Sequence, residues 1–470
     1  MTHQFHSTVL REYDIRGIIG ETLGAEDARA IGRGFGTLMR RAGGKKVAVG
    51  YDGRVSSPML AEALIDGLTS AGCDVRNVGM GPTPMLYYAE ASAEDVDGGI
   101  QITGSHNPAN YNGFKMVFKG RPFFGEDITT LGTMATAGDW IADDVPGSVE
   151  THEIMEEYVE RMLVALQGLD QGKLAGLKVG WDAGNGAAGP ALELLASRLP
   201  GEHHLLFTEV DGNFPNHHPD PTVPENLEDL RALVAAKNLD FGVAFDGDGD
   251  RIGAIDGEGR IIWGDQLLMI YAEDLLRDRP GSTIIADVKA SRALFDTVRE
   301  HGGTPLMWKT GHSLIKSKMK ETGAPLAGEM SGHVFFADTY YGYDDALYAG
   351  VRLIAAAARL GKSVTRLRGD MPAMLNTPEL RFQVDESRKF AAIAEVKKRM
   401  AVATGVEVND TDGVRVNTPD GWWLLRASNT QDVLVARAES ETEDGLARLL
   451  GQIDEQLELS GLERGEQAGH

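Results

Sequence analysis

A short polar loop, Thr103-Gly104-Ser105-His106-Asn107-Pro108, carries the residue types best suited to covalent chemistry. It follows an apolar run at 98–102 that predicts a buried strand, and the Asn-Pro pair favours a turn that ends this strand. A serine hydroxyl on such a loop, beside a histidine, is a candidate nucleophile. The glycine would let a ligand approach the backbone closely. A polar loop without any reaction is the alternative, and a Ser-His pair by itself does not exclude it.

Three aspartates at alternate positions, Asp246, Asp248 and Asp250, follow a second apolar strand. The glycines between them allow the backbone to curl, so that the three carboxylates can converge on one cation, and oxygen ligands select Mg²⁺ or Ca²⁺. An EF-hand loop would need glycine and glutamate where Arg251 and Gly257 stand. A solvated acidic turn is less favoured, because three crowded carboxylates repel one another. Arg251 could bind a phosphate oxygen beside the cation.

Three further loops carry polar residues that become informative only together. Glu329 and Ser331, in the loop 328–333, could exchange hydrogen bonds with a polyol. The loop 309–313 places a lysine, hydroxyls and an imidazole around a glycine. The loop 426–430 follows a predicted strand with a guanidinium, two hydroxyls and an amide, a set that suits a phosphate. Each of the three could equally be an ordinary turn.

A serine nucleophile, a three-aspartate cation site and a separate phosphate-binding loop together indicate phosphoryl transfer. One phosphate would be held in the loop 426–430 while Ser105 acts on another position of the same molecule, as in a mutase that works through a phosphoserine. A serine hydrolase is disfavoured, because the Gly-x-Ser-x-Gly pattern is absent at Ser105. A Mg²⁺-dependent sugar phosphatase and a non-catalytic sugar-phosphate-binding protein remain open as alternatives.

The elements that must position these loops alternate between strands and helices as far as about residue 365. This alternation predicts largely parallel sheets covered on both faces, with ligands at the carboxyl ends of the strands. The runs 46–52, 177–182 and 283–287 each form a strand that ends in an aspartate, followed by a Gly- or Ser-bearing loop and a helix. This weak internal repeat favours three related α/β units. A serine, Ser56 or Ser57, is expected to cap the helix that follows the first of these strands.

The last hundred residues have a different pattern. Strands at 380–384, 414–416, 422–426 and 432–437, with helices at 387–403 and 443–459, predict an antiparallel sheet with helices, an α+β unit. The predicted domains, given by residue number, are 1–145, 146–255, 256–365 and 366–470.

Length and composition set the remaining limits. The chain has 470 residues, which suggests about three domains, and 42% hydrophobic with 25% charged residues is typical of a soluble globular protein. A net charge of -24 argues against a nucleic-acid partner, although a local basic pocket could still bind an anion. One cysteine, Cys73, permits no internal disulfide, which favours a reducing compartment. Without a visible signal peptide or a long apolar run, we expect a cytoplasmic protein with no membrane contact.

The motifs, in this order, resemble those of the α-D-phosphohexomutase family, and within it the phosphomannomutase/phosphoglucomutase branch. Gly104 and Met330 favour this branch over phosphoglucosamine mutase, which is the alternative within the family. The resemblance covers nearly the whole chain. It implies a heart-shaped arrangement of four domains: three related α/β domains with mixed sheets and a mobile C-terminal α+β domain. It also implies an isomerase that interconverts hexose 1-phosphate and hexose 6-phosphate through a phosphoserine, with hexose 1,6-bisphosphate as intermediate and activator.

The resemblance also implies roles for individual residues. Ser105 would carry the phosphoryl group and bind Mg²⁺ together with Asp246, Asp248 and Asp250. His106, Lys115 and His312 would transfer protons or stabilise charge. Hexose phosphates are the expected partners, and the chain is expected to be a monomer or a dimer. The other substrate-binding residues would be Tyr13, Arg16, Arg251, Lys289, Glu329, Ser331, His333, Arg426, Ser428, Asn429 and Thr430.

Overall fold

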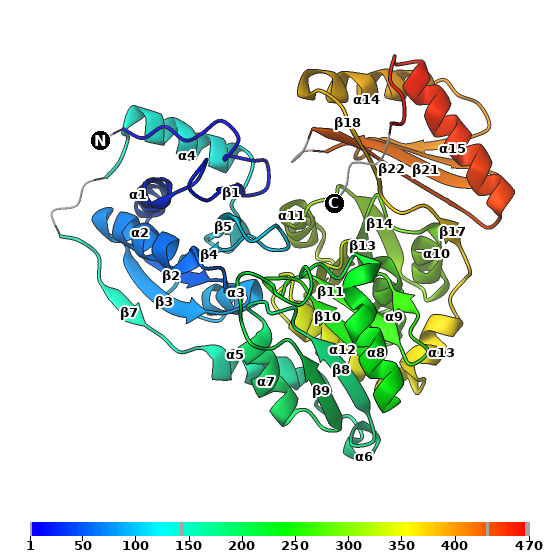
Figure 1. Cartoon of the computed structure of the whole chain (residues 1–470), viewed down its shortest axis with the longest axis horizontal. Coiled ribbons are helices and arrows are strands. Elements are labelled where there is room, and N and C mark those ends of the chain that lie inside the picture. Colours follow the sequence, from blue (N-terminus) through cyan, green and yellow to red (C-terminus); the bar gives the residue numbers. More distant parts are fainter. Residues whose placement is uncertain (1, 142–144, 429–431, 466–470) are drawn as a thin grey trace.

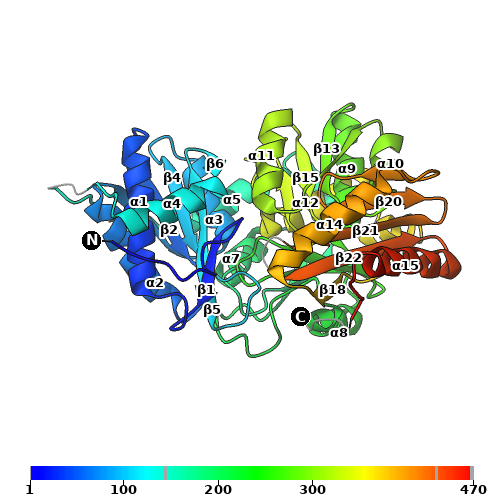
Figure 2. The ribbon, with the colours of Figure 1, turned by 90° about the horizontal axis from the view of Figure 1, so that it is seen from above.

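The structure, a computed structural model, describes residues 2–141, 145–428 and 432–465. In this part of the chain four sheets, each with its helices, follow one another around an arc (Figure 1). A view from above again places the first unit at one end and the C-terminal unit toward the other (Figure 2). None of the described helices combines the length and the apolar character needed to cross a bilayer. The predicted fold class, three α/β units followed by an α+β unit, is confirmed.

The first unit contains a seven-stranded mixed sheet in the order β1-β5-β4-β2-β3-β7, with β6 paired to β5. Strand β2 runs parallel to β3 and β4, so the carboxyl ends of β2 and β4 meet at one edge. The loop that carries Ser105 leaves the sheet at this edge. The strands are β1 (Ile15–Ile18), β2 (Lys46–Tyr51), β3 (Asp74–Met80), β4 (Gly98–Ile102), β5 (Tyr111–Phe118), β6 (Arg121–Pro122) and β7 (Val149–Thr151). The helices are α1 (Ala25–Arg41), α2 (Ser57–Ser70), α3 (Thr83–Ala91) and α4 (Glu126–Ala137).

The serine expected to cap α2 does not do so. Ser56 stands at the N-cap position, but its side chain makes no capping hydrogen bond. Its Oγ instead accepts a hydrogen bond from Asn112 Nδ2 at 2.9 Å, and Ser57 Oγ donates to Asp52 Oδ1 at 2.5 Å. The two hydroxyls therefore stabilise the sheet edge beside the loop of Ser105 rather than the end of the helix.

The second unit contains a five-stranded sheet in the order β12-β11-β10-β8-β9. The turn at 256–259 joins β11 to β12, and the three-aspartate loop joins β10 to β11. The strands are β8 (Lys178–Asp182), β9 (Glu202–Leu206), β10 (Phe241–Phe245), β11 (Ile252–Asp256) and β12 (Ile261–Ile262). The α-helices are α5 (Met155–Leu163), α6 (Gln171–Leu174), α7 (Gly189–Arg198) and α8 (Glu228–Lys237), with short 3₁₀ helices at Val164–Leu166 and Pro224–Leu227.

The third unit contains a four-stranded sheet in the order β14-β13-β15-β16. It shares one apolar core with the second unit, in which Trp181 and Phe245 of the second sheet pack in the same cluster as Leu347 of α12. The strands are β13 (Thr283–Asp287), β14 (Thr304–Trp308), β15 (Leu326–Gly328) and β16 (Val334–Phe336). The helices are α9 (Gly264–Asp278), α10 (Arg292–Glu300), α11 (His312–Thr322), α12 (Ala346–Leu360) and α13 (Val364–Gly369).

The C-terminal unit is an antiparallel sheet in the order β17-β22-β21-β20-β19, with β18 also paired to β22. Neighbouring residues of a strand point to opposite faces. Trp423 accordingly packs with residues of α14 and α15, and Trp422 packs on the other face against Val288 of the third unit. The strands are β17 (Leu375–Asn376), β18 (Leu380–Gln383), β19 (Glu407–Asn409), β20 (Val414–Thr418), β21 (Gly421–Ala427) and β22 (Val433–Ser440), and the helices are α14 (Glu386–Met400) and α15 (Glu443–Glu458).

The divisions between the predicted domains stay a prediction. Strand β7, at 149–151, belongs to the first sheet, and β11 and β12 extend the second sheet to Ile262. Membership of a sheet would therefore place the first division after residue 151 and the second after residue 262.

Candidate active site

Ser105 is buried at the carboxyl edge of the first sheet and faces the three-aspartate loop of the second unit. Its side chain is close to fully buried, and its Oγ donates a hydrogen bond to Asp246 Oδ2 at 2.8 Å. Its backbone has a φ of 50°, in the left-handed region that side chains other than glycine seldom adopt. The surrounding structure therefore holds the serine in a constrained position, as is often found at functional sites.

Arg54, for which no role was predicted from the sequence, is the residue that holds the serine loop in place. Its guanidinium is 1% exposed and donates to the carbonyls of Ser105 (2.7 Å), Asn107 (2.6 Å) and Pro108 (2.6 Å). Asp52 Oδ2 accepts from Arg54 Nε at 3.2 Å and from Gly104 N at 3.0 Å. The signal in the sequence was the Asp-Gly-Arg run after β2, whose relevance depends on β2 lying beside β4.

Gly104 is required by this packing. A Cβ atom at this position would lie 2.3 Å from Arg54 Nε, closer than real contacts allow. The glycine before the serine therefore gives space to the clamping guanidinium.

Asp246, Asp248 and Asp250 lie together in the loop after β10 and are completely buried. One oxygen of each lies within 4.8 Å of the others. Among the described residues, Asp248 Oδ1 and Asp250 Oδ1 have no hydrogen-bond partner. Burial, together with the two neighbouring carboxylates, raises the pKa of Asp246 well above its usual range. Asp250 Oδ1 also lies 3.3 Å from His333 Nε2, so Asp248 Oδ1 is the oxygen with neither a hydrogen bond nor an ion pair among the described residues. Buried carboxylate oxygens that converge in this way fit a hard divalent cation such as Mg²⁺.

Lys115, on β5, brings a fixed positive charge to the same carboxylates. Its Nζ lies 2.8 Å from Asp248 Oδ2 and also contacts Asp250 Oδ2. Burial alone would lower the pKa of Lys115, but the attraction of Asp248 and Asp250 outweighs it and raises the pKa. Asp248 and Asp250 therefore favour the charged form of Lys115.

Three histidines surround the site, and they differ in protonation state. His106 Nδ1 lies 3.3 Å from Ser105 Oγ, and burial lowers the pKa of His106 well below its usual value, so the ring is neutral at pH 7. Burial has the same effect on the pKa of His312, which stacks on His333 with 5.6 Å between ring centroids. Burial also disfavours the charged form of His333, but Asp250 and Glu329 outweigh this and raise its pKa to about 9. Two neutral imidazoles can accept a proton here, and one charged imidazole can attract an anion.

The loop 328–333 is connected to this cluster. Glu329 Oε2 lies 3.0 Å from His333 Nδ1, and Glu329 Oε1 accepts from Gly311 N at 2.6 Å. Ser331 Oγ lies 3.0 Å from His333 Nδ1, and Arg251 Nε lies 3.4 Å from His333 Nε2. The structure therefore brings the predicted sugar loop to the three-aspartate loop.

The N-terminal residues also reach the site. Arg16 Nη1 donates to Asn107 Oδ1 of the serine loop at 3.1 Å, and Arg16 Nη2 pairs with Asp14. Tyr13 OH donates to the carbonyl of Thr310 at 3.1 Å. The contact of Tyr13 with Thr310 links the first unit to the third.

The outer predicted cations lie in the third and C-terminal units. Lys289 follows β13, and its Nζ lies 3.0 Å from Glu379 Oε2. Arg426 lies near the end of β21 and pairs with Asp412 at 3.0 Å. Ser428 is buried beside Arg426, whereas Asn429 and Thr430 lie outside the described residues.

Asp344 is a second residue of the site that was not predicted from the sequence. Its Oδ1 pairs with Lys316 Nζ at 2.9 Å, and its Oδ2 lies 3.6 Å from His312 Nδ1. An Asp-Asp pair before a helix is typical of an N-cap, and Asp345 does cap α12. Helix capping accounts for Asp345, whereas nothing in the local sequence indicates the role of Asp344.

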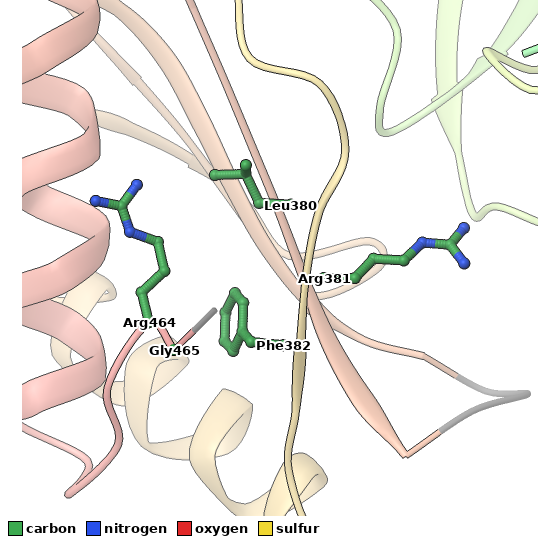
Figure 3. Close-up of a pocket in the computed structure, with 5 residues that line it drawn as sticks. All are labelled: Leu380, Arg381, Phe382, Arg464 and Gly465. Carbon is green, nitrogen blue, oxygen red and sulfur yellow. The ribbon is translucent and has the colours of Figure 1, made fainter. Parts of the chain in front are cut away.

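A cavity of about 190 Å³ in the C-terminal unit is separate from this site (Figure 3). Phe382 and Leu380 point into the space in front of Arg464, whereas Arg381 points away from it. None of the residues that line it belongs to the loops described above.

Comparison with known proteins defines the class first. Models of phosphoglucomutase/phosphomannomutase alpha/beta/alpha domains I, II and III match residues 7–140, 156–259 and 263–374, and the model of the C-terminal domain matches residues 379–456. The protein is thus a four-domain enzyme of the phosphosugar mutase class. With all four domains matched in order, the chain belongs to the phosphoglucomutase/phosphomannomutase family, which confirms the resemblance seen in its motifs.

Individual relatives are similar over nearly their full length. The chain is 46% identical to a phosphomannomutase/phosphoglucomutase of Pseudomonas aeruginosa, with 94% of each chain covered. It is 43% identical to a phosphoglucomutase of Neisseria gonorrhoeae, with 94% of this chain and 95% of the relative covered. A crystal structure of a phosphoglucomutase/phosphomannomutase family protein from Burkholderia thailandensis has a TM-score of 0.90 and 45% identity, and covers 97% of this chain and 98% of its own.

Proposed function

We propose that the protein interconverts hexose 1-phosphate and hexose 6-phosphate, with mannose and glucose phosphates as substrates and a phosphorylated Ser105 as the phosphoryl carrier. The observation that carries the proposal is the 2.8 Å contact between Ser105 Oγ and Asp246 Oδ2 within a buried three-carboxylate cluster. A hydroxyl in this position can exchange a phosphoryl group beside a divalent cation. The names of relatives more than 40% identical over nearly the whole chain support the same activity.

Asp246, Asp248 and Asp250, with the oxygen of Ser105, would hold Mg²⁺. The convergence of the three buried carboxylates, with Asp248 Oδ1 left without a hydrogen bond among the described residues, supports that assignment. When bound, the cation offsets negative charge on the transferring phosphoryl group.

The chain's own residues would complete the transfer. A sugar hydroxyl oxygen forms a bond to phosphorus while the bond from phosphorus to Ser105 Oγ breaks, and the hydroxyl proton passes to a neutral base. His106 and His312 are the proposed bases, because both rings are neutral. Lys115 stays charged and stabilises the negative charge that remains on Ser105 Oγ. The reverse transfer, from the other phosphate of the bisphosphate, restores the phosphoserine.

The remaining predicted residues would bind the substrate. Glu329 and Ser331 are proposed to contact sugar hydroxyls, with the charged ring of His333 behind them. Cations, hydroxyls and one amide would bind the phosphates and so determine which end of the sugar faces Ser105: Tyr13, Arg16, Arg251, Lys289, Arg426, Ser428, Asn429 and Thr430. Hexose 1,6-bisphosphate would act as intermediate and as activator.

The test is mutase activity on mannose 1-phosphate, glucose 1-phosphate and glucosamine 1-phosphate, with Mg²⁺ and a catalytic amount of hexose bisphosphate. We expect turnover of the first two and loss of steady turnover in Ser105→Ala, with sugar-phosphate binding retained. A clear preference for glucosamine 1-phosphate would contradict the assigned substrates. Release of inorganic phosphate without isomerisation would indicate a sugar phosphatase, and near-normal turnover in Ser105→Ala would refute the role of the serine.

A further inference from the structure

The two outer cations proposed to bind phosphate are already paired with carboxylates. Arg426 pairs with Asp412, and Lys289 pairs with Glu379. All four side chains are buried or nearly so, with exposures of 7% and 13% for the first pair and 9% and 15% for the second. These are therefore not solvated surface pairs, which contribute little.

The carboxylate of Asp412 binds the guanidinium of Arg426 in the way that a phosphate oxygen would. A single oxygen, Asp412 Oδ2, accepts from Arg426 Nε at 3.1 Å and lies 3.0 Å from Arg426 Nη2. Two neighbouring guanidinium nitrogens form the fork that binds carboxylates and phosphates alike. A phosphate that binds through this fork has to displace the carboxylate.

The same oxygen also joins the C-terminal unit to the third unit. Asp412 Oδ2 accepts from the backbone N of Thr310 at 3.1 Å. The carbonyl of Thr310 in turn accepts from Tyr13 OH of the first unit at 3.1 Å. The side-chain Oγ1 of Thr310 donates to Asp287 Oδ2 at 3.2 Å. The carboxylate therefore connects the three units through one hydrogen-bonded chain.

We infer that Asp412 is an internal competitor for the substrate phosphate: it occupies Arg426 when no phosphate is bound and lowers the affinity for hexose phosphates. This inference rests on the proposed function. In that reaction the bisphosphate must release its distal phosphate from Arg426 once in each cycle, so that its other end can reach Ser105. Release would leave the buried guanidinium unpaired, which is costly, unless another anion takes its place. Asp412 is in position to do so, and Glu379 is in the corresponding position for Lys289.

The inference is tested with Asp412→Asn, because the amide keeps the shape of the side chain and removes its charge. The matched control is Asp410→Asn, which removes the same charge from an exposed position on the same loop. Binding of glucose 1-phosphate is measured by titration calorimetry with Ser105→Ala as the common background, and kcat and KM are measured with Ser105 present. We expect Asp412→Asn to bind about tenfold more tightly and to lower both KM and kcat, because release becomes slow, while Asp410→Asn stays close to its parent.

Other outcomes overturn the inference in distinguishable ways. Weaker binding in Asp412→Asn would show that the carboxylate only orients Arg426, and unchanged binding with a lower melting temperature would show a purely structural role. Absence of glucose 1-phosphate binding in the parent protein would refute the proposed function, and the inference with it. If Asp412→Asn does not fold, Glu379→Gln makes the same test at Lys289, where tighter binding is again expected and weaker or unchanged binding refutes the competition.

Discussion

Replacing Lys115 with methionine should strongly destabilise the protein when no divalent cation is present. The side chain of Lys115 is 4% exposed, and its ammonium contacts two buried carboxylates, those of Asp248 and Asp250. Methionine has a similar length and no charge, so the variant keeps most of the packing and removes the cation from both carboxylates.

The magnitude follows from the burial of the partners. Removing one member of a buried ion pair costs about 3–5 kcal/mol, because the remaining charge is left uncompensated. Here two fully buried carboxylates lose the same partner, so we expect a loss near the upper end of this range. Mg²⁺ should reduce the deficit, because a cation that binds Asp248 and Asp250 replaces part of the lost charge and stabilises the folded state to which it binds.

The assay is urea unfolding followed by tryptophan fluorescence, in a chelator and in excess Mg²⁺. Lys119→Met is the matched control: Lys119 follows β5, is exposed, and donates to the Ala42 carbonyl at 2.9 Å. We expect a change below about 0.5 kcal/mol in this control. A loss in Lys115→Met no larger than in the control, or a deficit that Mg²⁺ leaves unchanged, would refute the reasoning.

Three further predictions concern other parts of the molecule. Arg426→Ala should weaken hexose-phosphate binding about tenfold or more, since a charged hydrogen bond contributes about 1.5–3 kcal/mol; an unchanged dissociation constant in calorimetry would remove the residue from the site. Burial raises the pKa of the Asp345 carboxyl to about 7, so between about pH 4 and pH 7 the folded chain retains a proton that the unfolded chain releases. The free energy of unfolding should therefore fall across this range as pH rises, by about 1.4 kcal/mol per pH unit. Asp345→Asn should flatten that slope in urea unfolding at several pH values, and an unaltered slope would exclude Asp345 as its source. Arg415 Nη1 donates to the carbonyls of Val288 and Ala290 at 2.7 Å, so Arg415→Met should cost about 2 kcal/mol or more and let the C-terminal unit melt separately in calorimetry; coincident melting at the normal temperature would contradict this.

The strands that carry the functional loops could be predicted from the sequence, because their signal is local. Apolar runs of about five residues are followed by polar residues at Ser105, Asp246 and Arg426, and each run lies in a strand of the structure. The residue types of these loops, taken together, then indicated phosphoryl transfer. The same local reasoning was wrong at Ser56, where a tertiary hydrogen bond to Asn112 replaces the helix cap.

The residues that support the site could not be predicted, because their roles depend on which strands are neighbours. Arg54 clamps the serine loop only because β2 lies beside β4 in the sheet. Asp344 contacts Lys316, 28 residues earlier in the sequence, and Asp412 contacts Thr310, 102 residues earlier. No periodicity or spacing within a short window can show contacts of this range.

The weak repeat in the sequence acquires a physical meaning from these contacts. In each α/β unit the repeated strand, β2, β8 or β13, lies parallel to the strand that carries a functional loop, β4, β10 or β15. The last residue of the repeated strand, or the segment that follows it, supports that loop: Asp52 accepts from Gly104 N at 3.0 Å, Ala187 N donates to the Gly247 carbonyl at 2.9 Å, and Asp287 accepts from Met330 N at 3.2 Å. Because parallel strands end at the same edge of a sheet, one unit can supply both the loop that does chemistry and the loop that holds it. The repeated segments therefore contain the residues that support the functional loops, and this role is the same in all three units. Ser105, the three aspartates and Glu329 differ between the units because the roles proposed for them differ.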